Sequence, residues 1–491
     1  MSSVAYPVLP GRLVVVLSRA PVTTTTDPVT RRRHTQRASG GLVTALQPLL
    51  GHPDVHVVSA ERADVARGRT LHRRMRRGAH LHIRQLPEEM FHAFYIESAS
   101  ELLWYAHHYL WDPARGPVVD QETYRAWSHG YRAANRQLAQ LAVRAAGDVR
   151  APIIWSHDYQ TYLVPGTVRA LRPDAVIEHF IHVPWPDARY FGLLPPTLRR
   201  TILASLVAAD LIGVQTQADA VRLLQSIELY LPGTRIDIAS QAIHYRGRTA
   251  WVRHYPVSVD ADALRRIARS RETRQRLEWL RPLLQGRLLL RIDRCEPAKN
   301  IVRGFLAFEN LLQRRPDLHG RITFLALLVP SRMQIDEYRA YRDEVFAEAG
   351  RINARFERDG WQPIRVLYGH DYARAVAALQ VYDVLLVNSL ADGMNLVAKE
   401  GAVLNRRRGV VVLSEAAGAI EELGPWTVNV APTDVLATSH AIESALAMPL
   451  DERVRRSAAL RTLVERRSGR AWLERQLDEL GHILEHRLAP A

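Results

Sequence analysis

Short apolar runs alternate with longer amphipathic stretches along almost the whole chain. The runs carry few charges and are apolar on both faces, which is typical of buried strands in a parallel sheet. The predicted strands cover residues 12–17, 55–58, 152–155, 176–181, 211–214, 287–292, 322–328, 365–367, 384–387 and 410–413.

The stretches between these runs repeat their apolar residues with a helical period. The predicted helices cover residues 122–146, 196–208, 216–226, 303–314, 333–358 and 470–486. Repeated alternation of strand and helix predicts an α/β fold with two doubly wound parallel-sheet domains rather than one very wide sheet.

The expected boundary between the domains lies near the polar and proline-containing stretch 255–260. We therefore expect an N-terminal Rossmann-like domain over 1–256 and a C-terminal one over 257–465. Residues 466–491 have no strand of their own and are placed as a helix that crosses back to the N-terminal domain. The threonine-rich and basic stretch 22–37 is expected to be a mobile loop.

The composition is that of a soluble globular protein, with 47% hydrophobic and 24% charged residues. The single cysteine, Cys295, excludes an internal disulfide framework and fits a reducing compartment. No apolar run reaches the roughly 18 residues of a membrane span, and the N-terminus does not resemble a secretory signal. We therefore expect a cytoplasmic protein without a membrane partner.

A net charge of +15 raises nucleic-acid binding as an alternative function. Basic clusters occur at 31–34, 73–77 and 405–408, but no zinc-finger spacing or RNA-binding aromatic signature accompanies them. Because arginine is spread along the whole chain, a positive field that attracts phosphorylated substrates is the simpler interpretation, and no nucleic-acid partner is expected.

Of the 66 basic residues two are lysines, Lys299 and Lys399, and the others are arginines. A lysine retained in such a composition indicates a site that needs a compact ammonium, for example as a point-charge partner of phosphate. Chance placement is the alternative.

Several polar segments follow predicted strands, at the edge where open α/β sheets bind ligands. Arg294 and Lys299 follow strand 287–292 and could hold a diphosphate, although a solvated loop with a salt bridge to Glu296 is the alternative. Asp392 could bind sugar hydroxyls, and Glu400, two turns later, could accept a ribose diol.

Glycines at two places could bring backbone amides close to an anion. Gly393 permits an unusual turn, after which the amides of 393–397 would form a helix N-terminus directed at anionic oxygen, unless the helix is simply capped and buried. The pair Gly40-Gly41 could approach a phosphate in the same way, but a plain turn with a helix cap explains such a pair more often.

In the N-terminal half, Asp158 and His182 lie in segments rich in histidine and aromatic residues that end predicted strands, which suits sugar binding. The sequence has 20 histidines but no H-E-x-x-H or paired-cysteine spacing, so no metal site is expected. The absence of a G-x-S-x-G elbow disfavours serine hydrolase chemistry.

Together these segments resemble the trehalose-6-phosphate synthases, the retaining glycosyltransferases of family 20, from about residue 12 to 480. The motifs are LLWYAHHY, HDYQ, FIHVPWP, the Arg294…Lys299 loop, LVPSR, AGRINARF, DGMNLVAKE and LSEAAGA. The resemblance implies the GT-B fold, in which two Rossmann-like domains face a cleft.

The resemblance also implies a role for individual residues. Those matching contacts to the acceptor glucose 6-phosphate are Arg19, Tyr95, Trp104, Asp158 and Arg332. Those matching contacts to the nucleotide-sugar donor are Gly41, His182, Arg294, Lys299, Asp392, Gly393, Met394, Asn395, Leu396, Val397 and Glu400. Those implied to act in catalysis are Asp158, His182, Arg294, Lys299 and Asp392.

The implied reaction transfers glucose from a nucleoside diphosphate glucose to glucose 6-phosphate with retention, giving α,α-trehalose 6-phosphate. The nucleoside diphosphate leaves from the front face, without a protein nucleophile, a metal or another cofactor. Both substrates are small molecules, and a homo-oligomer, a dimer or tetramer, is expected.

The sequence departs from the family in the loop that holds the two cations. The common loop reads Arg-Leu-Asp-Tyr-(Ser/Thr)-Lys-Gly, whereas residues 294–300 read Arg-Cys-Glu-Pro-Ala-Lys-Asn. This version resembles an actinobacterial branch that uses GDP-glucose, which makes GDP-glucose the favoured donor and UDP-glucose the alternative. Ala391 also replaces an arginine that is common before Asp-Gly-Met-Asn.

Two other functions are kept as alternatives. One is a related transferase or pseudoglycosyltransferase with a different acceptor or a cyclitol donor, similar to validoxylamine 7′-phosphate synthase or glucosylglycerol-phosphate synthase. The intact segment 392–400 and the complete acceptor set disfavour it. The other is a catalytically silent regulatory copy, which the retained charged positions disfavour.

Overall fold

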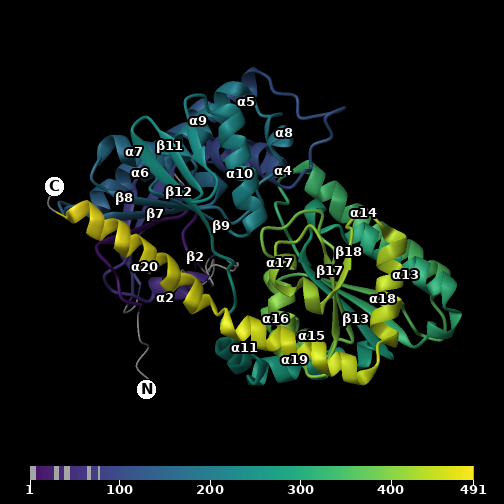
Figure 1. Ribbon diagram of the computed structural model, residues 1–491. Coiled ribbons are helices and arrows are strands. Elements are labelled where there is room, and N and C mark those ends of the chain that lie inside the picture. Colours follow the sequence, from purple (N-terminus) through teal and green to yellow (C-terminus); the bar gives the residue numbers. More distant parts are fainter. Residues whose placement is uncertain are drawn as a thin grey trace. The chain divides into compact units, whose positions relative to one another are not determined.

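The computed structural model describes residues 7–26, 33–37, 42, 45–63, 68–75 and 78–489, except for the side chains of 23–26 and 33–37. The chain forms two compact units; in Figure 1 the first is coloured purple to teal and includes the yellow C-terminal helix, and the second is coloured teal to yellow. Unit 1 comprises residues 1–256 and 470–491, and unit 2 comprises residues 257–469.

The described part of unit 1 contains a ten-stranded sheet in the order β10-β11-β12-β9-β8-β7-β1-β4-β6-β5. The strands from β12 to β6 in this order are parallel, whereas β10, β11 and β5 pair antiparallel at the edges. Their bounds are β1 Leu13–Val16, β4 His56–Arg62, β5 Thr70–Arg74, β6 His80–Leu86, β7 Ile153–His157, β8 Val176–Phe180, β9 Leu211–Val214, β10 Arg235–Asp237, β11 Ala242–Tyr245 and β12 Arg248–His254.

The central strands of this sheet are buried, and their apolar side chains join one core with those of the covering helices. The long predicted helix 122–146 is present as α5 Gln121–Arg125, a π-helical segment Ala126–Arg132 and α6 Ala133–Ala146. Asp120 caps its first turn by accepting from the Thr123 amide. The other helices of unit 1 are α2 Gln47–Leu50, α3 Glu88–Phe91, α4 Trp104–His107, α7 Val164–Leu171, α8 Ala188–Phe191, α9 Pro196–Leu206 and α10 Gln217–Tyr230.

The expectation of a mobile loop over 22–37 is wrong for the described residues of that stretch. Strands β2 Val22–Thr26 and β3 Arg33–Arg37 pair antiparallel as a hairpin. The reason is chemical, since β2 is a run of β-branched residues, which favour extended backbone.

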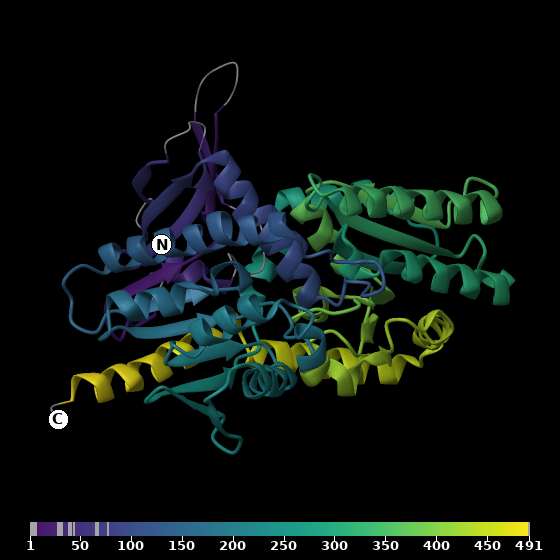
Figure 2. The same ribbon diagram turned by 90° about the horizontal axis from the view of Figure 1, so that it is seen from above.

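Unit 2, whose residues are all described, has a six-stranded parallel sheet in the order β15-β14-β13-β16-β17-β18. The strands are β13 Arg287–Arg294, β14 Ile322–Val329, β15 Ile364–Tyr368, β16 Val384–Val387, β17 Val410–Ser414 and β18 Val428–Val430. Numbered along the chain this is the 3-2-1-4-5-6 order of the Rossmann fold, and Figure 2 shows helices on both faces of the sheet.

The helices of unit 2 connect these strands and cap several of their own ends with side chains, for example Asp260 and Asp434 at the starts of α11 and α18. They are α11 Ala261–Ala268, α12 Arg271–Leu280, α13 Ile301–Arg314, α14 Asp336–Phe356, α15 Tyr372–Leu379, α16 Leu396–Leu404, α17 Ile420–Leu423, α18 Val435–Ala447 and α19 Leu450–Arg466. All ten strands and all six helices predicted from periodicity are thereby confirmed.

The last helix, α20 Gly469–Leu488, belongs to unit 1 apart from its first residue and runs along the sheet of that unit (Figure 1). The indole Nε1 of Trp472 donates to the carbonyl oxygen of Tyr255 at 3.0 Å, and Leu473, Leu480 and Leu484 are buried. Among the described residues, no helix is both long and apolar enough to cross a membrane.

The strand orders identify one switch point in each sheet, where the chain reverses the direction in which it adds strands. It lies between β1 and β7 in unit 1 and between β13 and β16 in unit 2. In doubly wound sheets, ligands bind beyond the carboxyl ends of the strands at such a point. The residues after these four strands are therefore the candidates for a ligand site.

Candidate functional site

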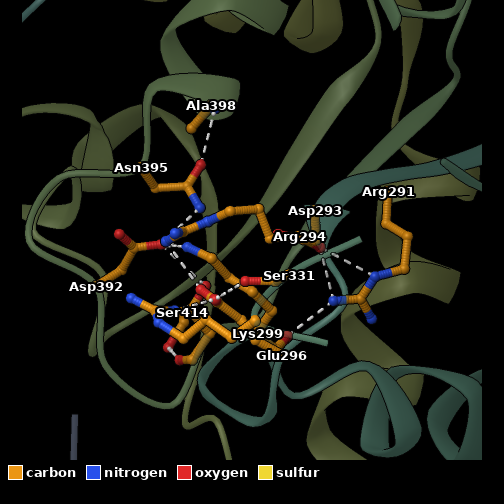
Figure 3. Close-up of polar contacts among 12 residues, drawn as sticks. Arg291, Asp293, Arg294, Glu296, Lys299, Ser331, Asp392, Asn395, Ala398 and Ser414 are labelled. Atoms are coloured by element: carbon orange, nitrogen blue, oxygen red, sulfur yellow. Dashed lines mark hydrogen bonds and ion pairs between the residues drawn. The ribbon is translucent and has the colours of Figure 1, made fainter. Parts of the chain in front are cut away.

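The switch point of unit 2 brings together Lys299, which follows β13, and Asp392, which follows β16. The Lys299 Nζ donates to Asp392 Oδ2, and the same oxygen accepts from Asn395 Nδ2 at 3.0 Å and from Ser389 Oγ at 3.3 Å (Figure 3). The two charged side chains are 12% and 15% exposed. The sequence placed both at one edge of a sheet, and the structure makes them an ion pair.

The helix after Asp392 begins later than expected. Asn395 has a positive φ of 71° and caps α16, because its side-chain oxygen accepts from the Ala398 amide at 3.2 Å. Gly393 and Met394 are buried in the turn before it, so only Leu396 and Val397 of the expected 393–397 set belong to the first helical turn. The N-terminus of α16 still supplies the positive end of a helix dipole beside Asp392.

Glu296 is the residue of this site whose role sequence reasoning missed. Its fully buried carboxylate lies 2.9 Å from Arg294 Nη2, so the salt bridge considered as an alternative is present. The other carboxylate oxygen, Oε2, accepts from Arg332 Nη1 at 2.9 Å and from Ser331 Oγ at 3.0 Å. One carboxylate thus holds two arginines that the family resemblance assigns to two different substrates.

A second buried charged residue, Arg291, stabilises the loop at 294–300 through hydrogen bonds. Its guanidinium donates to Asp293 Oδ2 at 2.8 Å and to the carbonyl oxygens of Lys299 at 2.8 Å and Ile301 at 3.3 Å (Figure 3). Burial raises the pKa of the Asp293 carboxyl, and the Arg291 guanidinium opposes that rise. A charged residue inside the apolar run 287–292 was the available sequence signal for this support.

Asn300 explains one of the departures from the family loop. It adopts a left-handed conformation with φ of 56°, which glycine and asparagine tolerate best. Its side-chain amide donates to the Asn388 carbonyl oxygen at 2.9 Å, and Asn388 Nδ2 donates to the Asn300 carbonyl oxygen at 3.1 Å. The asparagine thus satisfies the backbone requirement of a glycine and also ties the loop after β13 to the end of β16.

Glu400, expected at a ribose, lies on α16. One of its carboxylate oxygens accepts from the hydroxyl of Tyr372 at 3.1 Å. Burial raises the pKa of Glu400 to about 7, so its charge changes within the physiological range.

Lys399 is not a phosphate ligand. Its side chain is only 2% exposed, and its Nζ donates to Glu422 Oε2 and, at 2.7 Å, to the carbonyl oxygen of Val257. Arg467 reaches the other oxygen of Glu422 at 2.7 Å. Of the two lysines, Lys399 therefore stabilises the fold of unit 2 and only Lys299 lies in the candidate site.

In unit 1, Arg19, in the segment after β1, contacts an aromatic side chain. The Arg19 guanidinium lies 5.4 Å from the centre of the Tyr95 ring, so these two proposed phosphate contacts lie together. Trp104 is buried and stacks on His108 with ring centres 3.6 Å apart, so its bulk faces the interior of unit 1. Gly41, the remaining glycine of the set, lies outside the described residues.

The ends of β7 and β8 meet at Asp158 and His182. Asp158, with φ of 70°, accepts from the His182 amide at 3.2 Å, and the His182 ring lies within hydrogen-bond distance of His157 and Gln215. Burial lowers the pKa of His182 to about 3 and that of His157 well below its usual value. Both imidazoles are therefore neutral at pH 7.

Over the described parts of the chain, no three histidine, cysteine, aspartate or glutamate side chains cluster as a metal-binding group.

Solved structures of similar overall fold define the class of the protein. An alpha,alpha-trehalose-phosphate synthase (UDP-forming) from Burkholderia vietnamiensis has a TM-score of 0.85 and 28% identity, covering 98% of this chain and 99% of that one. A Burkholderia xenovorans synthase in complex with glucose-6-phosphate has a TM-score of 0.83 and 26% identity over 96% and 100% of the chains. A structure from E. coli bound with UDP-2-fluoro glucose has a TM-score of 0.84 and 26% identity over 96% and 99%. With two Rossmann-like units and charged residues at a switch point, the chain is a glycosyltransferase of the GT-B fold.

Sequence comparison then identifies the family. The profile of Glycosyltransferase family 20 matches residues 11–482, and the chain belongs to that family.

Individual relatives differ in how much of their length the chain spans. A bifunctional trehalose-6-phosphate synthase/phosphatase of Thermoproteus tenax is 32% identical over 94% of this chain, which spans 62% of that protein. The chain spans 48% and 42% of two Arabidopsis thaliana relatives. A trehalose-6-phosphate synthase of Mycolicibacterium smegmatis is 31% identical over 97% of this chain and 92% of its own length.

Proposed function

We propose that the protein transfers glucose from a nucleoside diphosphate glucose to glucose 6-phosphate with retention, giving α,α-trehalose 6-phosphate and a nucleoside diphosphate. The observation that carries this proposal is the group formed by Arg294, Lys299, Asp392 and Asn395 at the switch point of unit 2. Related structures with bound glucose-6-phosphate and UDP-2-fluoro glucose support the two substrate classes.

In this proposal the cations neutralise the charge that develops on the departing diphosphate. Lys299 and Arg294 contact its oxygens, and the amides at the start of α16 add the positive end of the helix dipole. Asp392, released in part from Lys299, accepts from glucose hydroxyls. Because two side-chain cations supply the charge, we propose that turnover requires no divalent metal and no other cofactor.

The remaining residues are proposed as hydroxyl and phosphate contacts. Asp158 and the neutral His182 hydrogen-bond to sugar hydroxyls near the reacting carbon. Arg19, Tyr95, Trp104 and Arg332 hold the acceptor phosphate and its sugar, with Glu296 fixing the position of Arg332. Glu400 accepts from the donor ribose.

GDP-glucose is the donor we favour, on the strength of the Arg-x-Glu-Pro-x-Lys-Asn version of the loop at 294–300. UDP-glucose is the competing donor, since several relatives are described as UDP-forming. We also propose a homo-oligomer, which light scattering on the purified protein would test.

The deciding experiment measures nucleoside diphosphate release from UDP-, GDP- and ADP-glucose, each with and without glucose 6-phosphate and with and without EDTA. Release that depends on glucose 6-phosphate, with an α,α linkage in the product by NMR, is the expected result. Release that a cyclitol phosphate supports and glucose 6-phosphate does not would favour the pseudoglycosyl alternative. No turnover with any donor would point to a silent copy.

A further inference from the structure

A second basic site lies in unit 2, at the amino-terminal end of the sheet. It is a surface cavity of about 520 Å³, widely open to solvent, where β13 and β16 begin and next to the start of α19. The charged residues that line it are Arg287, Asp383, Arg406, Arg407, Arg408 and Arg453. Five arginines and one carboxylate therefore line it, and the arginines of the basic cluster 405–408 noted in the sequence lie here.

The carboxylate of Asp383 cannot neutralise the arginines around it. Its oxygens lie 3.2 Å from Arg287, 3.5 Å from Arg407 and 3.8 Å from Arg453, and one of them also accepts from the Leu288 amide at 2.8 Å. Arg287 and Arg407 each remain 48% exposed, so their guanidinium groups retain faces open to a ligand.

The Arg453 side chain is held by hydrogen bonds to the backbone and is largely shielded from water. It is 11% exposed, and its Nε and Nη2 donate to the carbonyl oxygens of Arg408 and Arg407, both at 2.9 Å. Burial lowers the pKa of Arg453, the positive charges of Arg287 and Arg408 lower it further, and Asp383 opposes them. The folded chain thus concentrates positive charge in a preorganised concavity, which an anion would stabilise.

This cavity is separate from the candidate active site. Arg287 begins β13 and Arg294 ends it, and an eight-residue strand is about 23 Å long at roughly 3.3 Å per residue. A ligand here would leave Lys299 and Asp392 uncovered.

We propose that this cavity binds an oligophosphate anion, with Arg287, Arg407 and Arg453 contacting its phosphate oxygens. Several arginines spread over a volume larger than one phosphate favour a chain of phosphates over a single one, and the planar guanidinium groups suit paired contacts to phosphate oxygens. Asp383 orders the arginines and leaves an excess of positive charge.

The test is calorimetric titration of the full-length protein with inorganic tripolyphosphate, in buffer containing physiological salt. To remove the donor site as a source of binding, we would titrate the Lys299→Met protein in parallel. Binding that persists in Lys299→Met and weakens about ten-fold or more in Arg287→Ala and in Arg407→Ala is the expected outcome.

The matched control is Arg455→Ala, which removes an equal charge from the same helix as Arg453 but outside the cavity, where Arg455 pairs with Glu452. Its affinity should equal that of the unsubstituted protein, and thermal melts check that each variant is folded. ATP as a second titrant distinguishes an inorganic phosphate chain from a nucleotide as the ligand. Equal affinity for ATP and tripolyphosphate means that the phosphate chain alone is recognised, and tighter binding of ATP means that the nucleoside contributes. Binding that disappears in Lys299→Met, or that survives both cavity substitutions, would overturn the proposal, as would no binding of tripolyphosphate at millimolar concentration.

Discussion

The two units share a doubly wound topology and place polar residues at their switch points, but the electrostatics of those points differ. In unit 1, His157 ends β7 at the switch point and His182 follows the neighbouring strand β8, and burial keeps both neutral. In unit 2 the strand ends carry Lys299 paired with Asp392, and Glu296 in the same loop as Lys299 pairs with two arginines. Topology fixes which strand ends lie at a switch point, whereas burial and pairing decide whether the side chains there are neutral or charged.

The two lysines of unit 2 show the same effect of burial within one unit. Lys299 and Lys399 both form an ion pair with a carboxylate, yet one pair lies at a sheet edge and the other is enclosed. Substitutions at both, and at the arginine and carboxylates around them, can break or sharpen this comparison.

The largest effect is expected for Lys299→Met. Removing the ammonium takes away charge stabilisation of the leaving diphosphate, and kcat should fall by about 10²–10³-fold, as for loss of one preorganised donor. Stopped assays of nucleoside diphosphate release, with a thermal melt to show that the variant is folded, are the measurement. Near-normal turnover would show that Lys299 does not stabilise the leaving diphosphate.

Lys399→Met should act on stability instead. The substitution leaves Glu422 buried with Arg467 as its remaining partner, and breaking a buried pair costs about 3 kcal/mol. Urea unfolding should show this loss, while kcat per folded molecule stays within about two-fold of the parent. A selective loss of kcat without a loss of stability would mean that Lys399 acts in catalysis after all.

Arg332→Ala should raise the KM for glucose 6-phosphate by about ten-fold or more, with a smaller change in kcat, because it removes a charged contact to the acceptor phosphate. Initial rates over a range of glucose 6-phosphate at saturating donor give both constants. An unchanged KM for glucose 6-phosphate would show that Arg332 does not bind the acceptor.

Glu296→Gln should have a several-fold effect on the same constant. The amide keeps the shape of the carboxylate but loses the charge that holds Arg294 and Arg332, so both arginines become less well placed. In a double-mutant cycle with Arg332→Ala the two effects should not add. Additive effects would show that Glu296 does not act through Arg332.

The smallest effect concerns pH. Because the pKa of Glu400 is raised to about 7, the group is largely protonated at pH 6 and largely ionised at pH 8. The ionised form is the stronger acceptor for a ribose diol, so donor KM should fall a few-fold as the pH rises through 7. Glu400→Gln should flatten this dependence, and an identical profile in the variant would assign the titration to another group.

Much of the fold could be predicted from local sequence because buried parallel strands leave an apolar signal on both faces. Strands such as β5, β6, β10 and β12 were missed, since their alternating or polar residues lie at or near sheet edges. The β2–β3 hairpin was missed because a polar β-branched run resembles a loop in a hydropathy pattern.

The candidate site could be predicted in its parts but not in its connections. Arg294, Lys299 and Asp392 were identifiable because charged residues directly after apolar strands must lie at one sheet edge. The pairing of Glu296 with Arg332 was not, because 36 positions separate the two residues in sequence and only the β13–β14 pairing brings their loops together.

The sequence by itself determined the strand–helix alternation, the family and the residue types available for chemistry, because these depend on local periodicity and motif spacing. Only the tertiary structure decided which of two lysines lies at the switch point, which histidines are neutral, and which arginines share a carboxylate. Those properties depend on burial and on contacts between segments far apart in the chain, and no local pattern encodes them.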